Sequence, residues 1–539
     1  MPSSSSPTSP LVAGLPDELL SKVFQACNPP PPDADVIEAN CEFEDVNYDI
    51  QLLHLKQVCR RWKVLVEESP LLWTHISLAF QHADYISEAL QRSKECLLVV
   101  HSAPGYSTGH SRYGERKVKS DERQAELLVG LLRKHLHRIR VLAVAHTVQK
   151  AIGGGLQPGD LSQATALEHF LLPTSSQLFE NSVWIAILLS APKLRAMRCF
   201  GYLSQSAWQK FVSVQYQFLD TLCIGDTNPQ TLPGIPTMIS LLRNLPLLQH
   251  LTLLDYREER NESFVRDSVE LPMLRLLMIV ECCHRMAYRL ISNMVLPLDC
   301  RVAFIGGYED NITATDAPCI MDAARRISAT VRPHDLQRLE VSAWRSNQLV
   351  LCAFSALAPE CAQHIPIPSL PGLAPRFLEQ LGWTYVTELC LPSCGHMLTC
   401  KNSGRPWSPT GERELMALCR ILGSVTSLTV NCCFCKAQLP FLASLIGPRT
   451  ADGSSLFPKL DILVLHITPV SHNPKDYIES CRIGFAKALE TAVRRRQASS
   501  DTHIDYLTLT SPECADVVPN KIVDRLEKIV RSFNIIENW

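Results

Sequence analysis

Few side-chain clusters in the sequence have the composition of a chemical site. The segment CLPSCGHMLTC brings Cys390, Cys394, His396 and Cys400 close together, and zinc prefers thiolate and imidazole ligands. Their spacing is not the CxxC knuckle of structural zinc sites, and Cys390 ends an alternating run typical of a buried strand. We therefore favour strand packing here, and the sequence predicts no metal ion and no cofactor.

Other short catalytic signatures are missing. We find no GxSxG, HExxH, GxxxxGK[ST] or EF-hand pattern. The glycine run between Gly153 and Asp160 lacks the preceding strand and following helix of a phosphate loop, and it contains a proline. We expect a loop there and a chain that is not an enzyme. An enzyme with an unrecognised site is an open alternative, because the absence of a short motif is weak evidence.

Basic residues form three clusters, at Arg60 and Arg61 beside Trp62, at 116–119, and at 494–496. The last two have no interleaved aromatic residues that could stack on bases, and 494–496 ends a helix whose dipole favours cations. We expect solvated surfaces. The 52 basic and 54 acidic side chains give a net charge of −2, which provides no general attraction for nucleic acid or an anionic membrane.

The composition is that of an intracellular globular protein of 539 residues. The first residues have no basic and apolar signal-peptide pattern, and no apolar run reaches the ~20 residues that span a bilayer. The 21 cysteines are scattered through apolar segments, as reduced buried thiols are. We expect a cytoplasmic or nuclear location and no membrane.

Two helical stretches follow a Ser/Pro-rich lead-in at 1–13. The first begins at LPDELLSKVFQAC, where Pro16 suits the first turn. A Pro-rich and acidic segment, about 28–50, is longer than usual connections and is predicted to be an inserted loop. The second stretch covers about 51–68, ends before Pro70, and can be two helices with a small bend.

The apolar faces of these helices differ in width. On a helical wheel the second stretch has one ordinary core-facing stripe, formed by Leu55, Val58, Cys59, Trp62, Leu65 and Val66. The first helix spreads its apolar residues over about half its circumference, namely Leu15, Leu19, Leu20, Val23, Phe24 and Cys27. One partner helix cannot cover that surface. It must be buried against the following domain or against another protein.

From about residue 79 the chain alternates helical stretches with short strands of Leu-x-Leu type. Equivalent strand positions are separated by about 25 to 29 residues, inside the ~20–29 range of leucine-rich repeats; these positions are Leu142, Phe170, Met197, Leu222, Leu251 and Leu276. Later steps lengthen and the consensus asparagine is mostly missing. We predict an α/β (α+β) protein in which 79–539 form an irregular leucine-rich-repeat-like solenoid. An α/β domain of another topology is the alternative.

LPDELLSKVFQ and LKQVCRRWKVLVEESPLLWTHISL together resemble an F-box, over residues 14–78. The Leu-Pro opening, paired leucines, Val-Cys-x-x-Trp core and Pro-x-x-Trp close stand in order. The insertion resembles that of F-box proteins of mushroom-forming fungi. The resemblance assigns to the F-box core and adaptor-facing surface Leu15, Pro16, Leu19, Leu20, Val23, Phe24, Leu55, Val58, Cys59 and Trp62. Val64, alone on the polar side of its helix, is a further candidate contact or simply an isolated exposed valine.

The resemblance implies a substrate-receptor subunit of an SCF-type cullin-RING ubiquitin ligase. Its F-box would dock on a Skp-type adaptor and through it a cullin, while the repeat region would recruit an unknown protein substrate, with no nucleic acid involved. An adaptor-bound scaffold without a role in ubiquitylation is an alternative that the sequence does not separate from it. On either hypothesis, Arg60 and Arg61 belong to the solvated or adaptor-rim face of a docking helix.

Overall fold

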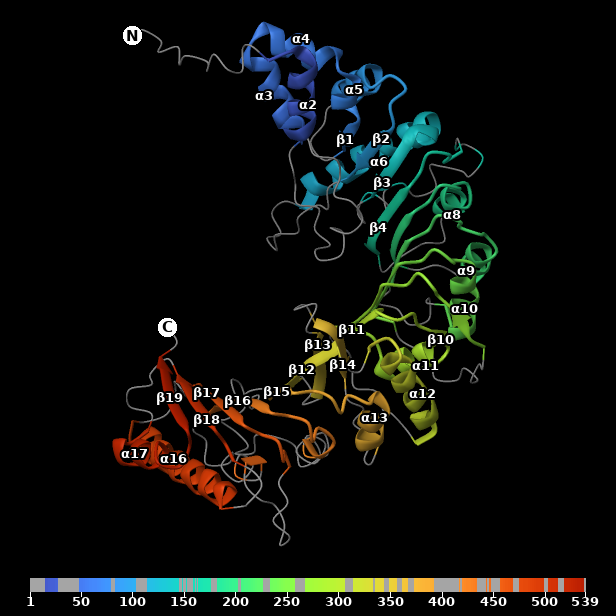
Figure 1. Cartoon of the computed structure of the whole chain (residues 1–539). Coiled ribbons are helices and arrows are strands. Elements are labelled where there is room, and N and C mark those ends of the chain that lie inside the picture. The colour runs from blue at the N-terminus through green and yellow to red at the C-terminus, as the bar shows by residue number, and fades with distance from the viewer. Residues whose placement is uncertain are drawn as a thin grey trace, which may run out of the picture. The chain divides into compact units, whose positions relative to one another are not determined.

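The structure is a computed structural model of the whole chain. It describes residues 15–27, 48–78, 83–102, 114–144, 163–175, 182–201, 205–225, 233–256, 267–305, 314–332, 335–343, 349–355, 361–366, 373–391, 419–433, 456–468, 475–498, 503–511 and 518–537, with the isolated residues 148, 152, 159, 161, 416, 443, 445 and 446. The chain divides into two compact units, Met1–Phe264 and Val265–Trp539, coloured blue to green and green to red in Figure 1. Each is described by itself.

The first unit opens with four short helical segments: α2 (Asp17–Cys27), α3 (Tyr48–Val58), α4 (Arg60–Glu68) and the 3-10 helix η2 (Pro70–Trp73). Asp17 and Glu18 lie in the first turn of α2, where the helix dipole favours anions. Cys59 has an extended backbone and separates α3 from α4. This confirms the bend expected in the second stretch. The inserted loop lies outside the described residues.

A parallel sheet forms the rest of this unit. Its strands, in spatial and chain order, are β1 (His75–Ser77), β2 (Leu98–His101), β3 (Ile139–Ala143), β4 (His169–Ser175), β5 (Ala196–Gly201), β6 (Thr221–Gly225) and β7 (His250–Leu254). The helices of the connections are α5 (Ala83–Arg92), α6 (Gly114–His135), η4 (Leu136–Arg138), α8 (Ser182–Leu189), α9 (Gln205–Val212) and α10 (Ile235–Arg243). Crossover helices are the usual connection between parallel strands. Consecutive helices α8, α9 and α10 also contact one another along one side of the strands (Figure 1).

The strand register aligns most of the strand positions that the sequence indicated as equivalent. Leu142 pairs with Phe170, Phe170 with Met197, Met197 with Leu222, and Leu222 with Leu251, and all of these side chains are buried. The last expected position, Leu276, is one residue off. In its strand, β9 (Leu276–Val280), the buried side chains are Leu277 and Ile279, so the core position is Leu277.

The same backbone turn precedes many strands in both units. The amide of a buried apolar residue donates to the carbonyl three residues earlier, as at Leu194, Leu219, Leu248, Leu274, Val386, Val425 and Leu460. At the start of a strand, one backbone carbonyl also accepts hydrogen bonds from two consecutive amides at the start of the neighbouring strand. Asp220 accepts from Gln249 and His250 in the first unit, and Thr426 accepts from Asp461 and Ile462 in the second. A recurring turn thus satisfies the backbone groups where the consensus asparagine is missing.

The second unit contains a longer sheet whose pairings give the spatial order β9, β11, β14, β13, β12, β15, β16, β17, β18, β19. The bounds of the strands after β9 are β11 (Arg301–Ile305), β12 (Leu336–Ala343), β13 (Leu349–Ser355), β14 (Cys361–Pro366), β15 (Glu388–Leu391), β16 (Ser427–Cys433), β17 (Ile462–Thr468), β18 (Tyr506–Ser511) and β19 (Ser532–Glu537). All pairings are parallel except those of β13, which is antiparallel to both of its neighbours.

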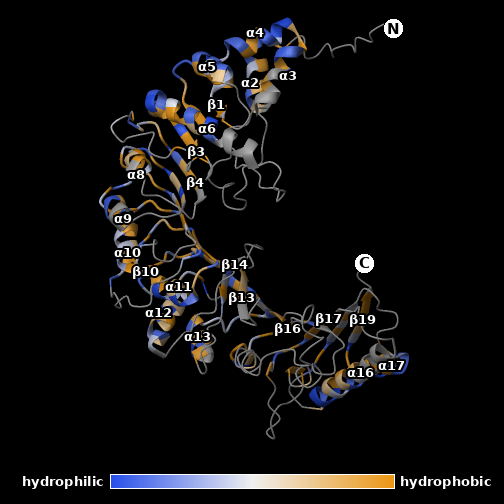
Figure 2. Ribbon diagram, turned by 180° about the vertical axis from the view of Figure 1, so that it is seen from behind, coloured by the Kyte–Doolittle hydropathy of each residue, from blue (hydrophilic) through white to orange (hydrophobic). Residues whose placement is uncertain are grey.

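Helices and a small ribbon complete this unit. Those with described bounds are α11 (His284–Ser292), η6 (Ala314–Asp316), α12 (Ala317–Ser328), α13 (Leu373–Leu381), α16 (Lys475–Gln497) and α17 (Asn520–Leu526), with the parallel pair β8 (Val269–Glu270) and β10 (Met294–Val295). Figure 2 shows hydrophobic residues concentrated in the strands and hydrophilic residues on the outer sides of helices such as α12 and α16. The predicted mixed α/β fold class is confirmed.

Residues 116–119 belong to helix α6. The expectation of a solvated surface was wrong at 494–496. Arg496 is fully buried: its guanidinium donates to the carbonyls of Ile446, Phe457 and Leu460, at 3.3, 2.5 and 3.4 Å. Burial lowers the pKa of Arg496 to about 10. Because each helical residue turns the chain by about 100°, three consecutive arginines cannot all face water on a packed helix.

Candidate functional site

The helices α2, α3 and α4 and the 3-10 helix η2 enclose a small hydrophobic core. Its buried members are Leu20, Phe24, Leu52, Val66, Leu72, Trp73 and Ala89, and the partly buried Leu15, Leu55, Trp62, Leu65 and Tyr85 pack against them. Phe24 of α2 meets Trp62 of α4 edge to face, with ring centroids 4.8 Å apart, a favourable aromatic geometry. Of the residues expected in the site, Leu15, Leu20, Phe24, Leu55 and Trp62 therefore hold the helices together.

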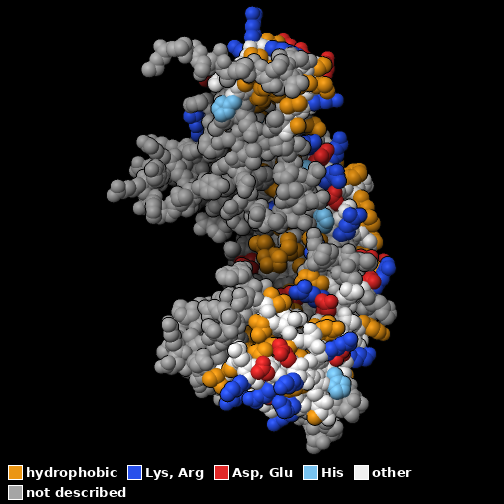
Figure 3. Space-filling view, turned by 60° about the vertical axis from the view of Figure 1, so that its left-hand side comes forward, with side chains coloured by type: hydrophobic (Ala, Val, Ile, Leu, Met, Phe, Trp, Pro, Cys, Tyr) orange, Lys and Arg blue, Asp and Glu red, His pale blue; other side chains and the backbone are white. Residues whose placement is uncertain are grey.

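The other expected residues are exposed on the same helices. Leu19 and Val23 on α2 are 46% and 47% exposed, and Val58 at the end of α3 is 48% exposed. Pro16 and Cys59 are exposed as well. We call Pro16, Leu19, Val23, Val58 and Cys59 the outer face. Val64 and Leu71 are also exposed, and Figure 3 shows hydrophobic side chains at the surface near its upper end, where these helices lie.

The position of Val58 and Cys59 corrects the helical wheel, which placed both on the core side. Cys59 has φ −161° and ψ 168°, and its Sγ accepts a hydrogen bond from the Trp62 amide at 3.5 Å. Because Cys59 is extended, α3 and α4 are two separate helices, and the side of α4 that faces the core is not set by the periodicity of α3. Trp62 and Val66 of α4 contribute to the core. A wheel that assumes one continuous helix cannot describe both faces.

Arg61 has a partner within the chain, which the expectation of a solvated arginine pair missed. Its Nε and Nη2 donate to Oδ1 of Asp17 at 2.8 and 2.6 Å, and Nη2 also donates to the Leu15 carbonyl. The guanidinium thereby fixes α4 to the start of α2. Arg60, the neighbouring residue, is exposed as expected. Arg61 therefore links two helices of the chain, whereas Arg60 lies at the surface.

The sequence of this helical region matches a known family. Residues 12–79 match the F-box-like family model. The F-box-like region is a small part of the chain, and its limits lie close to those expected from the sequence. A search of curated proteins finds none with a matching sequence. F-box domains generally bind Skp-type adaptors.

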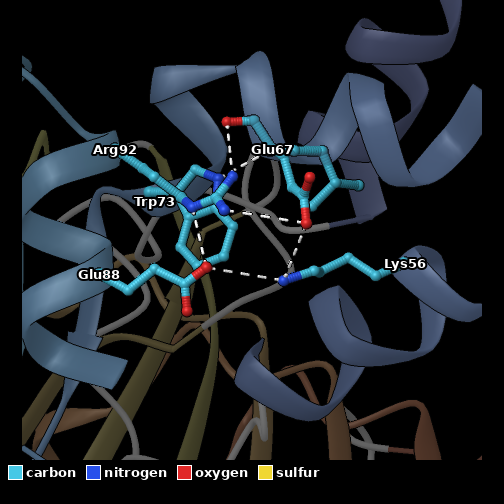
Figure 4. A network of polar contacts seen from close by, with 6 residues as sticks. Lys56, Glu67, Trp73, Glu88 and Arg92 are labelled. Carbon is cyan, nitrogen blue, oxygen red and sulfur yellow. Dashed lines mark hydrogen bonds and ion pairs between the residues drawn. The ribbon is translucent and has the colours of Figure 1, made fainter. Parts of the chain in front are cut away.

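A polar network joins the F-box-like helices to α5 (Figure 4). Arg92 of α5 forms an ion pair with Glu88 at 2.9 Å, and its Nη1 donates to the Glu67 carbonyl of α4 at 3.0 Å. Lys56 of α3 lies 3.5 Å from the Glu67 carboxylate and 3.7 Å from that of Glu88. Two cations and two carboxylates from three helices thus balance one another at a partly buried position.

Trp73 lies at the centre of this network. The guanidinium of Arg92 lies 4.9 Å, and the ammonium of Lys56 5.3 Å, from its ring centroid, within the range of cation–π attraction. Its indole Nε1 donates to the Val66 carbonyl at 2.7 Å. Because β1 begins only two residues after Trp73, the F-box-like helices are fixed to the first strand of the sheet. The Pro-x-x-Trp pattern in the sequence pointed to Trp73. It did not indicate the partners Lys56 and Arg92, which are far apart in the chain.

The described residues contain no group of three or more His, Cys, Asp or Glu side chains that could hold a metal ion. Cys390 is buried in strand β15 as expected, whereas Cys394, His396 and Cys400 lie outside the described residues. Most of the glycine run at 153–160 does too. Within the part of the chain that the structure covers, no helix is long and apolar enough to cross a membrane.

Two histidines, the buried His75 and the largely buried His101, lie on the strands β1 and β2. Burial lowers the pKa of His101 to about 4. Burial, the neighbouring His101 and Arg140 lower the pKa of His75 to about 4 as well. Both imidazoles are therefore neutral at pH 7 and belong to the structural interior. They offer no acid or base poised near neutrality.

Proposed function

We propose that the F-box-like region docks on a Skp-type adaptor through its outer face. The observation that carries this proposal is the division of apolar residues on α2: Leu20 and Phe24 complete the core, while Leu19 and Val23 stay exposed on the same helix. Exposed apolar groups that a domain's own packing does not use are typical of interaction sites. Docking would bury them and gain the free energy of removing apolar area from water.

We further propose that the chain is a non-catalytic substrate receptor of an SCF-type cullin-RING ubiquitin ligase, working inside the cell in the cytoplasm or nucleus. Holding a target near the ubiquitin-transferring subunits raises its effective concentration, so the receptor itself needs no reactive group. The α/β region would recruit the target as an irregular leucine-rich-repeat-like array. Its recurring turns and parallel strands support that interpretation.

The insertion suggests the mushroom-type fungal F-box in particular. Helix α2 ends at Cys27 and α3 begins at Tyr48, so the two matching halves are separated by a long connection without loss of their common core. The Trp73 network then has a mechanical role. By fixing α5 and β1 to the docking helices, it would set the orientation of the recruiting region's first strands relative to the adaptor.

The decisive experiment for ligase membership is assembly of the purified full chain with a Skp-type adaptor and a cullin. We expect a ternary complex that co-elutes in size-exclusion chromatography and is lost in the double variant Leu19→Asp, Val23→Asp. The control is Lys210→Ala, which alters an exposed residue of α9, outside the F-box-like region. Adaptor binding without recruitment of the cullin would favour the scaffold alternative. Equal assembly by the natural chain and the double variant would contradict docking through this face.

A further inference from the structure

The outer face consists of two segments that are distant in the chain. Pro16, Leu19 and Val23 belong to α2 and the residue directly before it, whereas Val58 and Cys59 lie where α3 ends and α4 begins. A partner that contacts both segments binds more tightly when they are held in a fixed relative position before docking, because less conformational entropy is then lost. The contacts within the chain that hold the two segments together therefore matter for docking.

The hydrophobic core holds α2 at Leu20 and Phe24. Both side chains are 1% exposed, and Phe24 packs edge to face on Trp62 of α4. The first turn of α2 is different, because residues 17–19 are all exposed and only the partly buried Leu15, directly before it, packs against the core. Helix ends fray more readily than helix centres. Core packing therefore constrains the middle of α2 more than its start.

Arg61 of α4 supplies a polar attachment at this first turn. Its Nε and Nη2 donate to Oδ1 of Asp17 at 2.8 and 2.6 Å, and Nη2 also donates to the carbonyl of Leu15. These two acceptors belong to the residues directly before and after Pro16, and Arg61 itself lies two residues after Cys59. One guanidinium therefore joins the two segments of the outer face.

Two neighbouring residues thus attach α2 to α4 at two points. Trp62 contacts Phe24, and Arg61 contacts Asp17, which lies two helical turns earlier on α2. A helix rises 1.5 Å per residue, so the two contacts are about 10 Å apart along α2. The exposed apolar residues of α2 lie between them. The second contact fixes the direction of the helix, and with it the place of these residues beside the α3–α4 junction.

The contact is suited to local order more than to global stability. The side chains of Arg61 and Asp17 are 38% and 57% exposed, and exposed ion pairs contribute little to the free energy of unfolding. The planar guanidinium nevertheless fixes the geometry of its acceptors through several donors at once. Because a helix end opens at much lower cost than the whole domain, the loss of such a contact should change the first turn and not the global fold.

We propose that Arg61 is a positioning residue for adaptor docking, which acts with Asp17 to hold the start of α2 beside the α3–α4 junction. The inference rests on the proposed function, because the adaptor is the partner that meets the outer face. Arg61 acts within the chain through its contacts with Asp17 and Leu15, and it does not need to touch the adaptor.

Isothermal titration calorimetry of the full chain with a Skp-type adaptor tests this role. Arg61→Ala should weaken binding by ~5-fold, which corresponds to about 1 kcal/mol, and Asp17→Ala by ~3-fold. The double variant should bind no more weakly than Arg61→Ala, because both substitutions break the same contact. Arg61→Lys keeps the charge but not the forked donors, so its affinity should lie between those of the natural chain and Arg61→Ala.

The matched control is Arg195→Ala. Arg195 forms an arginine–aspartate pair of the same kind with Asp220, at 3.0 Å, outside the F-box-like region. Its removal should leave adaptor affinity unchanged. The control therefore separates an effect of the contact at α2 from a general effect of losing an exposed arginine.

Hydrogen–deuterium exchange of the free chain separates positioning from direct contact with the adaptor. The amides of Leu19 and Leu20 donate to the Pro16 carbonyl, and the segment 15–20 should exchange ~3-fold faster or more in both Arg61→Ala and Asp17→Ala. Exchange in 21–27 and the midpoint of chemical denaturation should stay unchanged. A purely stabilising role would instead lower the midpoint and accelerate exchange throughout α2.

Each failure has a different meaning. Unchanged adaptor affinity in Arg61→Ala would overturn the positioning role and leave docking through the outer face intact. Weaker binding without faster exchange at 15–20 would indicate direct contact with the adaptor, and full affinity of Arg61→Lys would indicate a role of charge alone; either would also overturn it. A natural chain that does not bind the adaptor would contradict the proposed function itself, and with it any role of Arg61 in docking.

Discussion

Leu19 and Leu20 are neighbours on α2 in opposite environments, and the same truncation should therefore have opposite consequences at the two positions. Leu20 is 1% exposed and packs in the core with Phe24, whereas Leu19 is 46% exposed. Leu20→Ala should lower the free energy of unfolding by about 2–5 kcal/mol, the usual cost of a core cavity. Leu19→Ala should change it by less than ~0.5 kcal/mol, as surface substitutions do.

Adaptor affinity should show the reverse order. Full burial of a leucine side chain stabilises by about 1.5–3 kcal/mol. About half of Leu19 is already covered within the chain, so docking can gain about 0.7–1.5 kcal/mol from the rest. Its truncation should weaken adaptor binding by roughly 3- to 10-fold. Adding Val23→Ala, at a similarly exposed position one helical turn away, should bring the loss to about 10- to 100-fold if the two contributions add.

Isothermal titration calorimetry with the Skp-type adaptor would give the affinities, and chemical denaturation would give the stabilities. Leu20→Ala should bind with near-natural affinity at temperatures where it is still folded. The division of α2 into a core side and a docking side would be refuted if Leu19→Ala destabilised the chain as much as Leu20→Ala. It would equally be refuted if truncation of Leu19 and Val23 left the affinity unchanged.

Three other sites should each respond to a single substitution. Arg496→Ala should lower the free energy of unfolding by about 3 kcal/mol or more, because it removes the side-chain donor of three buried carbonyls, of which that of Phe457 keeps a second donor, the Leu460 amide. Arg495→Ala at the exposed neighbour should be neutral in the same denaturation assay. Trp73→Phe should cost about 1–2 kcal/mol, since the ring is kept but the bond to the Val66 carbonyl is lost; a neutral result would mean that this bond does not stabilise the F-box-like helices. The pKa of His101 is lower in the folded chain than in the unfolded chain, so the unfolded chain binds more protons, and the free energy of unfolding should fall as the pH drops from about 6.5 towards about 4. In urea titrations at a series of pH values, His101→Asn should reduce this dependence of the free energy of unfolding on pH. An unchanged dependence would contradict the assignment.

Regular periodic signals were readable from the sequence. Proline positions and the apolar stripe predicted the helices of the F-box-like region, and Leu-x-Leu alternation predicted strands such as β5, β6 and β17. Both are local patterns, since a buried face repeats every two or every 3.6 residues. The equivalence of Phe170, Met197 and Leu222 followed from the same regularity.

Features that depend on distant residues were missed. The pair β13 and β14 inserts an antiparallel strand into a parallel series, and no local pattern distinguishes the two directions. The clamp of Arg61 on Asp17 and the network of Lys56 and Arg92 around Trp73 join residues that only the tertiary fold brings together. Arg496 looked like one of three surface cations because its carbonyl partners come from other segments of the chain.

The division of the docking helices also lay beyond sequence reasoning. The ten expected residues were a mixture of core and surface positions, and the helical wheel that placed them took no account of the extended residue Cys59 between α3 and α4. Helical periodicity does not continue across such a break. Only the folded structure therefore shows which residues face the core and which face solvent.

Docking of the F-box-like region on an adaptor through exposed apolar residues is tested most directly by calorimetric titration of the purified natural chain with a Skp-type adaptor. We expect saturable binding at a ratio of one to one. The Leu19→Asp, Val23→Asp variant, still folded by circular dichroism, should show no measurable binding. Absence of binding by the natural chain, or undiminished binding by the folded variant, would contradict adaptor docking through the outer face.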